Sequence, residues 1–199
     1  MKEIFWAILK ILGFLLILPL IIASFLAFQN QILLLPPNKE VWVLWGVGSY
    51  AALNLFVYDF KTVYDFGKSL VEKILPFFKP AGYIVPIFTI FLIIIYIIAL
   101  ILGHGVSWRP YFLFFIAFTI AMHLILTAHE IYESDNSPLK AHYFFTYGAV
   151  LIISFFIMSL LLTWAIPEFS FVGFIKSLAS QTVHLYKSVY KGLFVDSSV

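Results

Sequence analysis

The chain has 199 residues, of which 63% are hydrophobic and 11% are charged, and its formal net charge is +2. A soluble domain carries about 25% charged residues, so this chain has too little polar surface to cover itself in water, and we expect lipid to surround it. The absence of cysteine excludes disulfides and thiolate metal sites, and the small net charge gives no support for nucleic acid as a partner. We therefore predict one all-α, polytopic membrane domain over residues 1–199.

Five apolar stretches are long enough to cross a bilayer, whose hydrocarbon core needs about 20 helical residues. The first is longer than the roughly 7–15 residues of a signal-peptide core, so we interpret it as a retained anchor with a kink at Pro19. The second contains Gly48 and Ala52, a spacing that lets another helix pack closely. We expect Pro86 in the first turn of the third stretch and a tight turn over 104–110 before the fourth. The predicted spans cover about 4–28, 41–58, 83–103, 111–132 and 142–166.

Two further stretches are amphipathic and too polar to cross a membrane. Residues 62–78 carry charges at helical spacing on one face and apolar side chains on the other, and residues 169–194 repeat this pattern with lysines on the polar face. Such helices lie in the plane of the membrane surface. Because an odd number of spans separates them, we expect them on opposite faces of the bilayer.

The distribution of basic residues predicts the orientation of the chain. With the N-terminus inside, the inner segments contain six lysines near the spans, against five basic residues in the outer loops and the tail. The positive-inside rule then favours an inside N-terminus and an outside C-terminus. The excess of lysine over arginine and the Phe- and Ile-rich composition without cysteine lead us to expect a bacterial inner membrane.

The fourth predicted span carries a polar stripe. Thr119, His123, Thr127 and Glu130 are spaced by four, four and three residues, so they share one face of a helix. Polar residues inside a membrane are costly and mark either function or hydrogen bonds between helices. A histidine and a carboxylate on one face would suit a proton relay. We expect the stripe to face other helices or a cavity, and Asn54 in the second span is a possible partner.

A metal site is the second hypothesis for the predicted inner end of the fourth and fifth spans. His129 and Glu133 have the i, i+4 spacing that can chelate a divalent ion, and His142 follows nearby. The zinc-peptidase pattern H-E-x-x-H fails because Glu133 stands where the second histidine belongs, and a solvated acidic loop is the alternative. Haem would need two histidines at one depth, and His123 has no such partner. We predict no cofactor and keep divalent metal and haem as alternatives.

Three functions fit these patterns. The chain has no G-x-S-x-G elbow and no glycine-rich phosphate loop. The first hypothesis is therefore a non-catalytic subunit or scaffold that packs against other membrane protein subunits. The second is a small proton-coupled carrier that uses the polar stripe, and the third is a membrane metalloenzyme that acts on lipid.

Overall fold

The computed structural model describes residues 2–78 and 80–194, and every regular element in them is a helix, which confirms the all-α class. The helices are α1 (Lys2–Leu33), α2 (Pro37–Phe56), α3 (Lys61–Ile74), α4 (Ala81–Ile84), α5 (Ile87–Ile101), α6 (Gly105–Ser134), the 3₁₀ turn η1 (Pro138–Lys140), α7 (Ala141–Ala165) and α8 (Phe171–Phe194).

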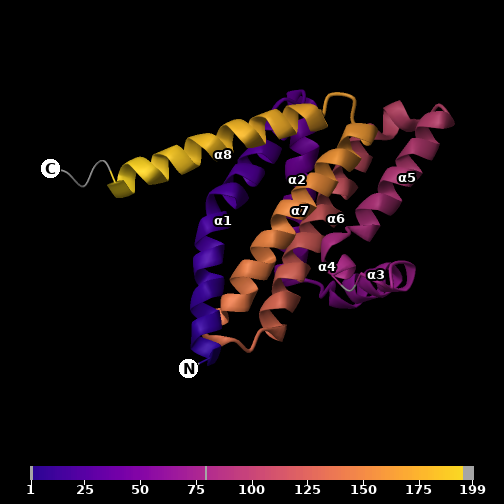
Figure 1. Ribbon diagram of the computed structural model, residues 1–199. Coiled ribbons are helices and arrows are strands. Elements are labelled where there is room, and N and C mark those ends of the chain that lie inside the picture. Colours follow the sequence, from indigo (N-terminus) through magenta and orange to yellow (C-terminus); the bar gives the residue numbers. More distant parts are fainter. Residues whose placement is uncertain (1, 79, 195–199) are drawn as a thin grey trace.

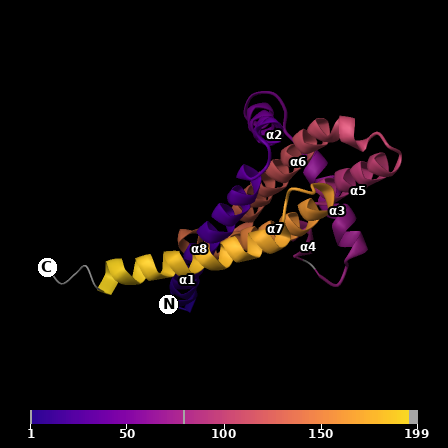
Figure 2. The ribbon, with the colours of Figure 1, turned by 90° about the horizontal axis from the view of Figure 1, so that it is seen from above.

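The long helices form a bundle with α6 at its centre (Figure 1). We call the end of the bundle that lies near the N-terminus the lower end. Helices α2, α5 and α7 pack against α6, and α1 packs against α7 and α8. Helix α3 lies at the lower end, whereas α8 crosses the upper end (Figure 1). Seen from above, α2 stands at the edge of the bundle (Figure 2).

Three of these helices are long and apolar enough to cross a membrane: Glu3–Leu33, Ser107–Ser134 and Pro138–Ala165. A fourth candidate is the pair Asn38–Phe56 and Lys61–Ile74, which is bent by 117° at the break between α2 and α3. Helix α5 is apolar but has only 15 residues. The structure thus supports a membrane protein with three or four candidate spans by this criterion, a smaller number than the five spans of the sequence prediction.

The third predicted span, 83–103, is not one continuous helix. Val85 has the extended conformation with φ −93° and ψ 111°, and it separates α4 from α5. The cause is Pro86, which lacks an N–H group and disfavours the helical conformation of the residue before it. The expected turn over 104–110 was also wrong, because α6 begins at Gly105 and continues through Pro110.

The loop between α6 and α7 is organised by a buried carboxylate. Asp135 accepts hydrogen bonds of 2.7 Å from the backbone N–H groups of Ser137 and Tyr143. Burial opposes the ionisation of Asp135, but the hydrogen bonds from Ser137 and Tyr143 outweigh it and hold its pKa below the usual value. Ser137 precedes η1, and its hydroxyl accepts the backbone N–H of His142 at 3.0 Å, so it caps the start of α7 rather than the turn itself.

Two glycines of α2 face in opposite directions. A Cβ atom at Gly46 would lie 2.3 Å from the carbonyl oxygen of Phe114, so this glycine allows α2 to approach α6 closely. A Cβ atom at Gly48 would have nothing within 4 Å, and Ala52, one turn further on, is exposed. The Gly48–Ala52 pair is therefore not used for packing within the described part of the chain.

Candidate functional site

The polar stripe of α6 faces α3, α4 and α5. Thr119 shares a hydrogen bond of 3.0 Å with Thr89 of α5, and its hydroxyl also donates to the carbonyl of Ile116. Thr127 shares a buried hydrogen bond of 2.9 Å with the hydroxyl of Tyr64 on α3. Each of these bonds replaces the water that the threonine hydroxyl would lose inside a membrane.

Glu130 forms an ion pair with Lys68 of α3. The Lys68 amine donates to Oε1 of Glu130, and it lies 4.1 Å from the centre of the Tyr83 ring. The Tyr83 hydroxyl donates to the same oxygen at 3.4 Å, while Glu72 lies 3.9 Å from the amine. A half-buried pair of this kind loses much of its hydration, so removing one partner would leave the other charge poorly compensated.

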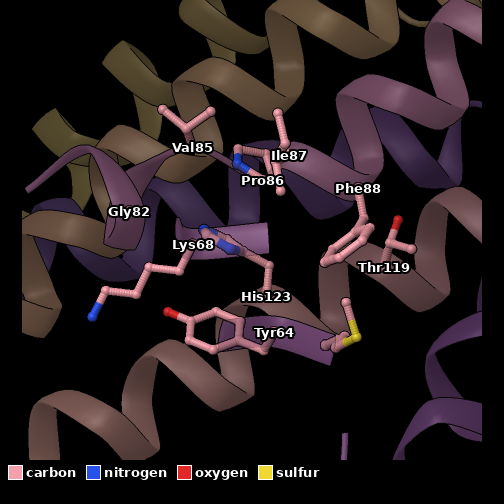
Figure 3. A pocket seen from close by; sticks show the side chains of 10 residues that line it. Tyr64, Lys68, Gly82, Val85, Pro86, Ile87, Phe88, Thr119 and His123 are labelled. Carbon is pink, nitrogen blue, oxygen red and sulfur yellow. The ribbon is translucent and has the colours of Figure 1, made fainter. Parts of the chain in front are cut away.

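His123 is the residue of the stripe whose ring has a nitrogen unpartnered within the described part of the chain. Its side chain is 5% exposed, its ring lies 6.1 Å from the ring of Tyr64, and the backbone of Tyr83 and Ile84 interacts with it. Nε2 has no hydrogen-bond partner among the described residues. Figure 3 shows the ring pointing toward Pro86, whereas the amine of Lys68 points away from it. The side chain of His123 thus reaches the break between α4 and α5 at Val85 and Pro86.

A small cavity lies beside His123. It measures about 10 Å³, and its lining includes Tyr64, Lys68, Pro86 and Thr119 (Figure 3). A cavity of roughly 10–15 Å³ accommodates about one water molecule if polar partners are present. The cavity can therefore hold one water molecule beside Nε2 of His123, and Nε2 itself can bind a proton. The cavity has no room for a larger molecule in this conformation.

The positions of these partners follow from two local features of the sequence. Gly67 lets α3 approach α5, since a Cβ atom there would lie 2.5 Å from the Phe88 ring. The break at Val85 and Pro86 ends α4 early and brings Tyr83 beside Lys68. The predicted helix 62–78 therefore does not only lie on the surface, because its residues Tyr64 and Lys68 bond to α6.

The structure does not bring Asn54 to the stripe. The amide oxygen of Asn54 accepts a hydrogen bond of 3.3 Å from Tyr50, four residues earlier on the same helix. Tyr50 is fully buried and packs edge-on against Phe118 at 5.3 Å. Intrahelical bonding thus satisfies Asn54, and the partners of the stripe come from α3, α4 and α5 instead.

The three residues of the predicted metal site do not converge. Nε2 of His129 lies 3.1 Å from Glu133, which also pairs with Lys61 at 3.1 Å. His142 shares a hydrogen bond of 3.3 Å with Thr146 on its own helix. Among the described residues, no group of three or more histidine and acidic side chains is arranged to hold a metal ion. His129 and Glu133 form the solvated pair of the alternative interpretation.

Sequence reasoning missed Tyr64, Lys68 and Tyr83 as part of this site. A usable signal was present, because Tyr64 and Lys68 are four residues apart and Thr127 and Glu130 are three apart, so each pair shares one face of its helix. Lys68 was instead assigned to the water-facing side of an amphipathic helix.

Comparison of this chain with the models of known protein families, with characterised proteins and with solved structures gives no match.

Proposed function

We propose that this protein is a non-catalytic, membrane-embedded subunit or scaffold of a larger membrane complex. The observation that supports it best is the use of the polar stripe: Thr119, Thr127 and Glu130 bond to other helices of the same chain. Such residues hold the bundle together, and the cavity beside them accommodates about one water. Polar groups that bond to neighbouring helices of the same chain serve packing rather than substrate binding.

The proposal includes five crossings with the N-terminus inside and the C-terminus outside a bacterial inner membrane. Helices α1, α2, α5, α6 and α7 run between the two ends of the bundle, while α3 and α8 lie at opposite ends (Figure 1). Helix α5 spans about 22 Å at 1.5 Å per residue, shorter than a hydrocarbon core of about 30 Å. Helix α4 precedes it and extends this crossing toward the lower end.

The outer face of α2 is the surface that we assign to a partner. Gly48 and Ala52 form a shallow strip there, flanked by the exposed side chains of Leu44, Trp45 and Leu55. Small residues one turn apart let two membrane helices approach closely, so van der Waals packing between the helices favours association. Because α2 stands at the edge of the bundle (Figure 2), a transmembrane helix of another subunit can reach this strip.

Copurification in a mild detergent tests the proposal, with Gly48→Leu as the disruptive variant. We expect the wild-type chain to elute with another polypeptide at fixed stoichiometry and Gly48→Leu to elute alone. The matched control is Gly192→Leu, since Gly192 also has open space around its Cβ position but lies on α8. A wild-type monomer that copurifies with nothing, or partner binding that survives Gly48→Leu, would contradict the proposal.

A proton-coupled carrier is the second candidate, and the open Nε2 of His123 is the observation that favours it. Oε2 of Glu130 also lacks a partner among the described residues, so two proton-binding atoms on one face of α6 are available. Transport would require the cavity at His123 to open toward a membrane surface.

Proton uptake by the reconstituted full chain separates the two candidates. A carrier loses substrate-driven proton uptake in His123→Ala and Glu130→Gln, while the Gly48→Leu variant transports normally. A subunit shows no uptake in the wild type, and Glu130→Gln lowers its thermal stability instead.

A further inference from the structure

A polar pocket lies at the lower end of the bundle, between the first turns of α1 and the loop that joins α6 to α7 (Figure 1). Its walls include Glu3, Trp6 and Lys10 of α1 and Asn136 and Ser137 of the loop. The pocket measures about 360 Å³, within the roughly 300–1,000 Å³ that small-molecule sites occupy. The loop wall is held in place, because the buried Asp135 carboxylate accepts the backbone N–H of Ser137.

Two opposite charges line this pocket. Glu3 and Lys10 are seven residues apart, so they lie on one face of α1. Neither takes part in an ion pair within the described part of the chain. The pocket thus offers a cation and an anion to a ligand, and a ligand with a single charge would pair with only one of them.

The spacing of the two charges fits a ligand that carries both signs. Seven helical residues rise about 10.5 Å, and because the side chains of a helix lean alike toward its N-terminus, the amine and the carboxylate remain well separated. Two charge-assisted hydrogen bonds of about 2.8 Å each, one to a phosphate and one to an ammonium group, leave roughly 5 Å of that rise for the ligand. A two-carbon bridge between a phosphate and an ammonium group spans such a distance.

The order of the charges along α1 matches the order of groups in a phospholipid. Helix α1 is long and apolar enough to cross a membrane, and its residues 11–33 contain no charged residue. Hydrocarbon therefore begins next to Lys10, and Glu3 lies farther out. In a phospholipid the phosphate is likewise next to the acyl chains, whereas the amine ends the headgroup. Trp6 lies between the two charges and is 49% exposed, as is typical of tryptophan at the membrane surface.

We propose that this pocket binds the phosphoethanolamine headgroup of a membrane lipid, with the phosphate against Lys10 and the ammonium group against Glu3. Lys10 extends its stem along apolar surface and places its amine among the phosphates. The primary ammonium group donates N–H hydrogen bonds to the Glu3 carboxylate. A phosphocholine headgroup has no N–H to donate, and an anionic headgroup leaves Glu3 without a cation.

Native mass spectrometry of the full-length protein in detergent tests this site with three probes that share the same acyl chains: phosphatidylethanolamine, phosphatidylcholine and phosphatidylglycerol. We expect one phosphatidylethanolamine molecule to remain bound after the other two lipids have been lost. Soluble glycerophosphoethanolamine at the same concentration should not displace it, because it lacks the acyl chains that favour apolar surface. Equal retention of the three lipids, or displacement by the soluble headgroup, would overturn the proposal.

Each charge has its own variant. Lys10→Gln should weaken phosphatidylethanolamine binding about fivefold, the effect of one lysine near a phosphate-bearing surface. Glu3→Gln should remove the preference for phosphatidylethanolamine over phosphatidylglycerol. Glu3 is exposed and Lys10 is partly exposed, so neither substitution disturbs the packed interior. A preference for phosphatidylethanolamine that survives in both variants would contradict the assigned contacts.

Lys73→Gln and Glu40→Gln are the matched controls. Each removes a charge that forms no ion pair within the described residues and does not line the pocket, so both should retain the lipid. The outcome does not depend on Gly48, so this site and the proposed partner surface can fail separately.

Discussion

At the scale of single residues, the hydroxyl and charged groups of α6 are bonded to groups on three neighbouring elements. Thr119, Thr127 and Glu130 reach α5, α3 and α4. In lipid an unsatisfied polar group costs several kcal/mol. These bonds therefore determine where α3 and α4 lie against α6. Two atoms of the stripe, Nε2 of His123 and Oε2 of Glu130, have no hydrogen-bond partner among the described residues.

The hydrogen bond between Tyr64 and Thr127 is suited to a double-mutant cycle. Tyr64→Phe and Thr127→Val each leave one buried hydroxyl without its partner and should lower the free energy of unfolding by about 1–3 kcal/mol. The double variant should lose less than the sum, with a coupling energy of about 0.6–1.7 kcal/mol. Unfolding of the detergent-solubilised protein by titration with sodium dodecyl sulfate measures these values.

The control for this cycle is Tyr111→Phe, because Tyr111 lies on α6 itself and is 59% exposed. That variant should have little effect alone and no coupling to Thr127→Val. Additive effects of Tyr64→Phe and Thr127→Val would show that the hydroxyl pair does not attach α3 to α6.

Residue spacing alone predicted that the stripe shares one face, because helical periodicity is a local property. It did not predict the partners, since these depend on how α3 folds back after the bend of 117° that separates it from α2. Asn54 was expected as a partner because it is a polar residue of the second span, but the hydroxyl of Tyr50, four residues earlier, donates to its amide oxygen.

At the scale of helices, α2 shows how one element can present two different surfaces. Gly46 lies against the backbone of α6, where even a methyl group would collide with the Phe114 carbonyl. Gly48 lies two residues further on, about 200° around the helix, and faces away from the bundle. The same residue type thus serves internal packing in one case and remains free for a partner in the other.

Substituting alanine at these two glycines should change stability in opposite directions. Gly46→Ala forces α2 away from α6 and should cost about 1–3 kcal/mol by overpacking. Gly48→Ala meets no neighbouring atom and should stabilise α2 by about 0.5–1 kcal/mol, since alanine is a better helix former. Thermal unfolding of the two purified variants, each without a partner protein, measures the difference in stability. Equal changes in stability would contradict the assignment of Gly46 to the face of α2 that packs on α6 and of Gly48 to the outer face.

Three helices and a loop are connected at the upper end by Glu168. This carboxylate pairs with Lys39 of α2 and lies 3.7 Å from Arg109 of α6, whose Nε donates to the Tyr96 hydroxyl at 2.9 Å. The hydrogen bond from Lys39 lowers the pKa of Glu168 below its ordinary value of 4.5; burial opposes this change and the charge of Arg109 supports it. A lowered pKa in the folded state means that the carboxylate stabilises the fold when it is ionised.

The contribution of Glu168 should therefore depend on pH. It is fully present above the ordinary pKa of 4.5 and is lost as the pH falls through the lower pKa of the folded state. At neutral pH, Glu168→Gln should reduce stability by about 0.2–1 kcal/mol, as expected for a partly exposed ion pair. Its melting temperature should approach that of the wild type under more acidic conditions.

Glu40→Gln is the comparison for that experiment, because Glu40 forms no ion pair within the described residues. If the difference in melting temperature between Glu168→Gln and the wild type grows as the pH falls below 4.5, the ionised Glu168 carboxylate does not stabilise the fold as assigned.

The predicted bounds of the fifth span agree with those of α7, where the apolar pattern is uninterrupted, whereas α6 begins at Gly105, before the predicted start at 111. The third predicted span failed at Val85 and Pro86, because one proline outweighs the apolar run that surrounds it. Pro110 shows the reverse case: it is the sixth residue of α6 and removes one helical hydrogen bond, yet the helix continues through it.

At the scale of the whole molecule, the bundle places α3 and α8 at opposite ends (Figure 1), and the proposed five crossings can be tested by labelling. Because the chain contains no cysteine, a single cysteine can be introduced and labelled without background. We expect Asn136→Cys and Lys73→Cys to react with a membrane-impermeant maleimide only from the inside. His104→Cys and Lys191→Cys should react only from the outside, and labelling of all four from one side would exclude five crossings.

The central claim is that the outer face of α2 contacts another protein, and photo-crosslinking in native membranes tests it most directly. A photoreactive side chain at Ala52 should give one protein adduct of defined mass, and Gly48→Leu should abolish that adduct. The same probe at Ile98, which is 51% exposed on α5, should give lipid adducts. If Ala52 also gives lipid adducts alone, or if its protein adduct persists in Gly48→Leu, the α2 face is a lipid-facing surface and the proposed role as a subunit is wrong.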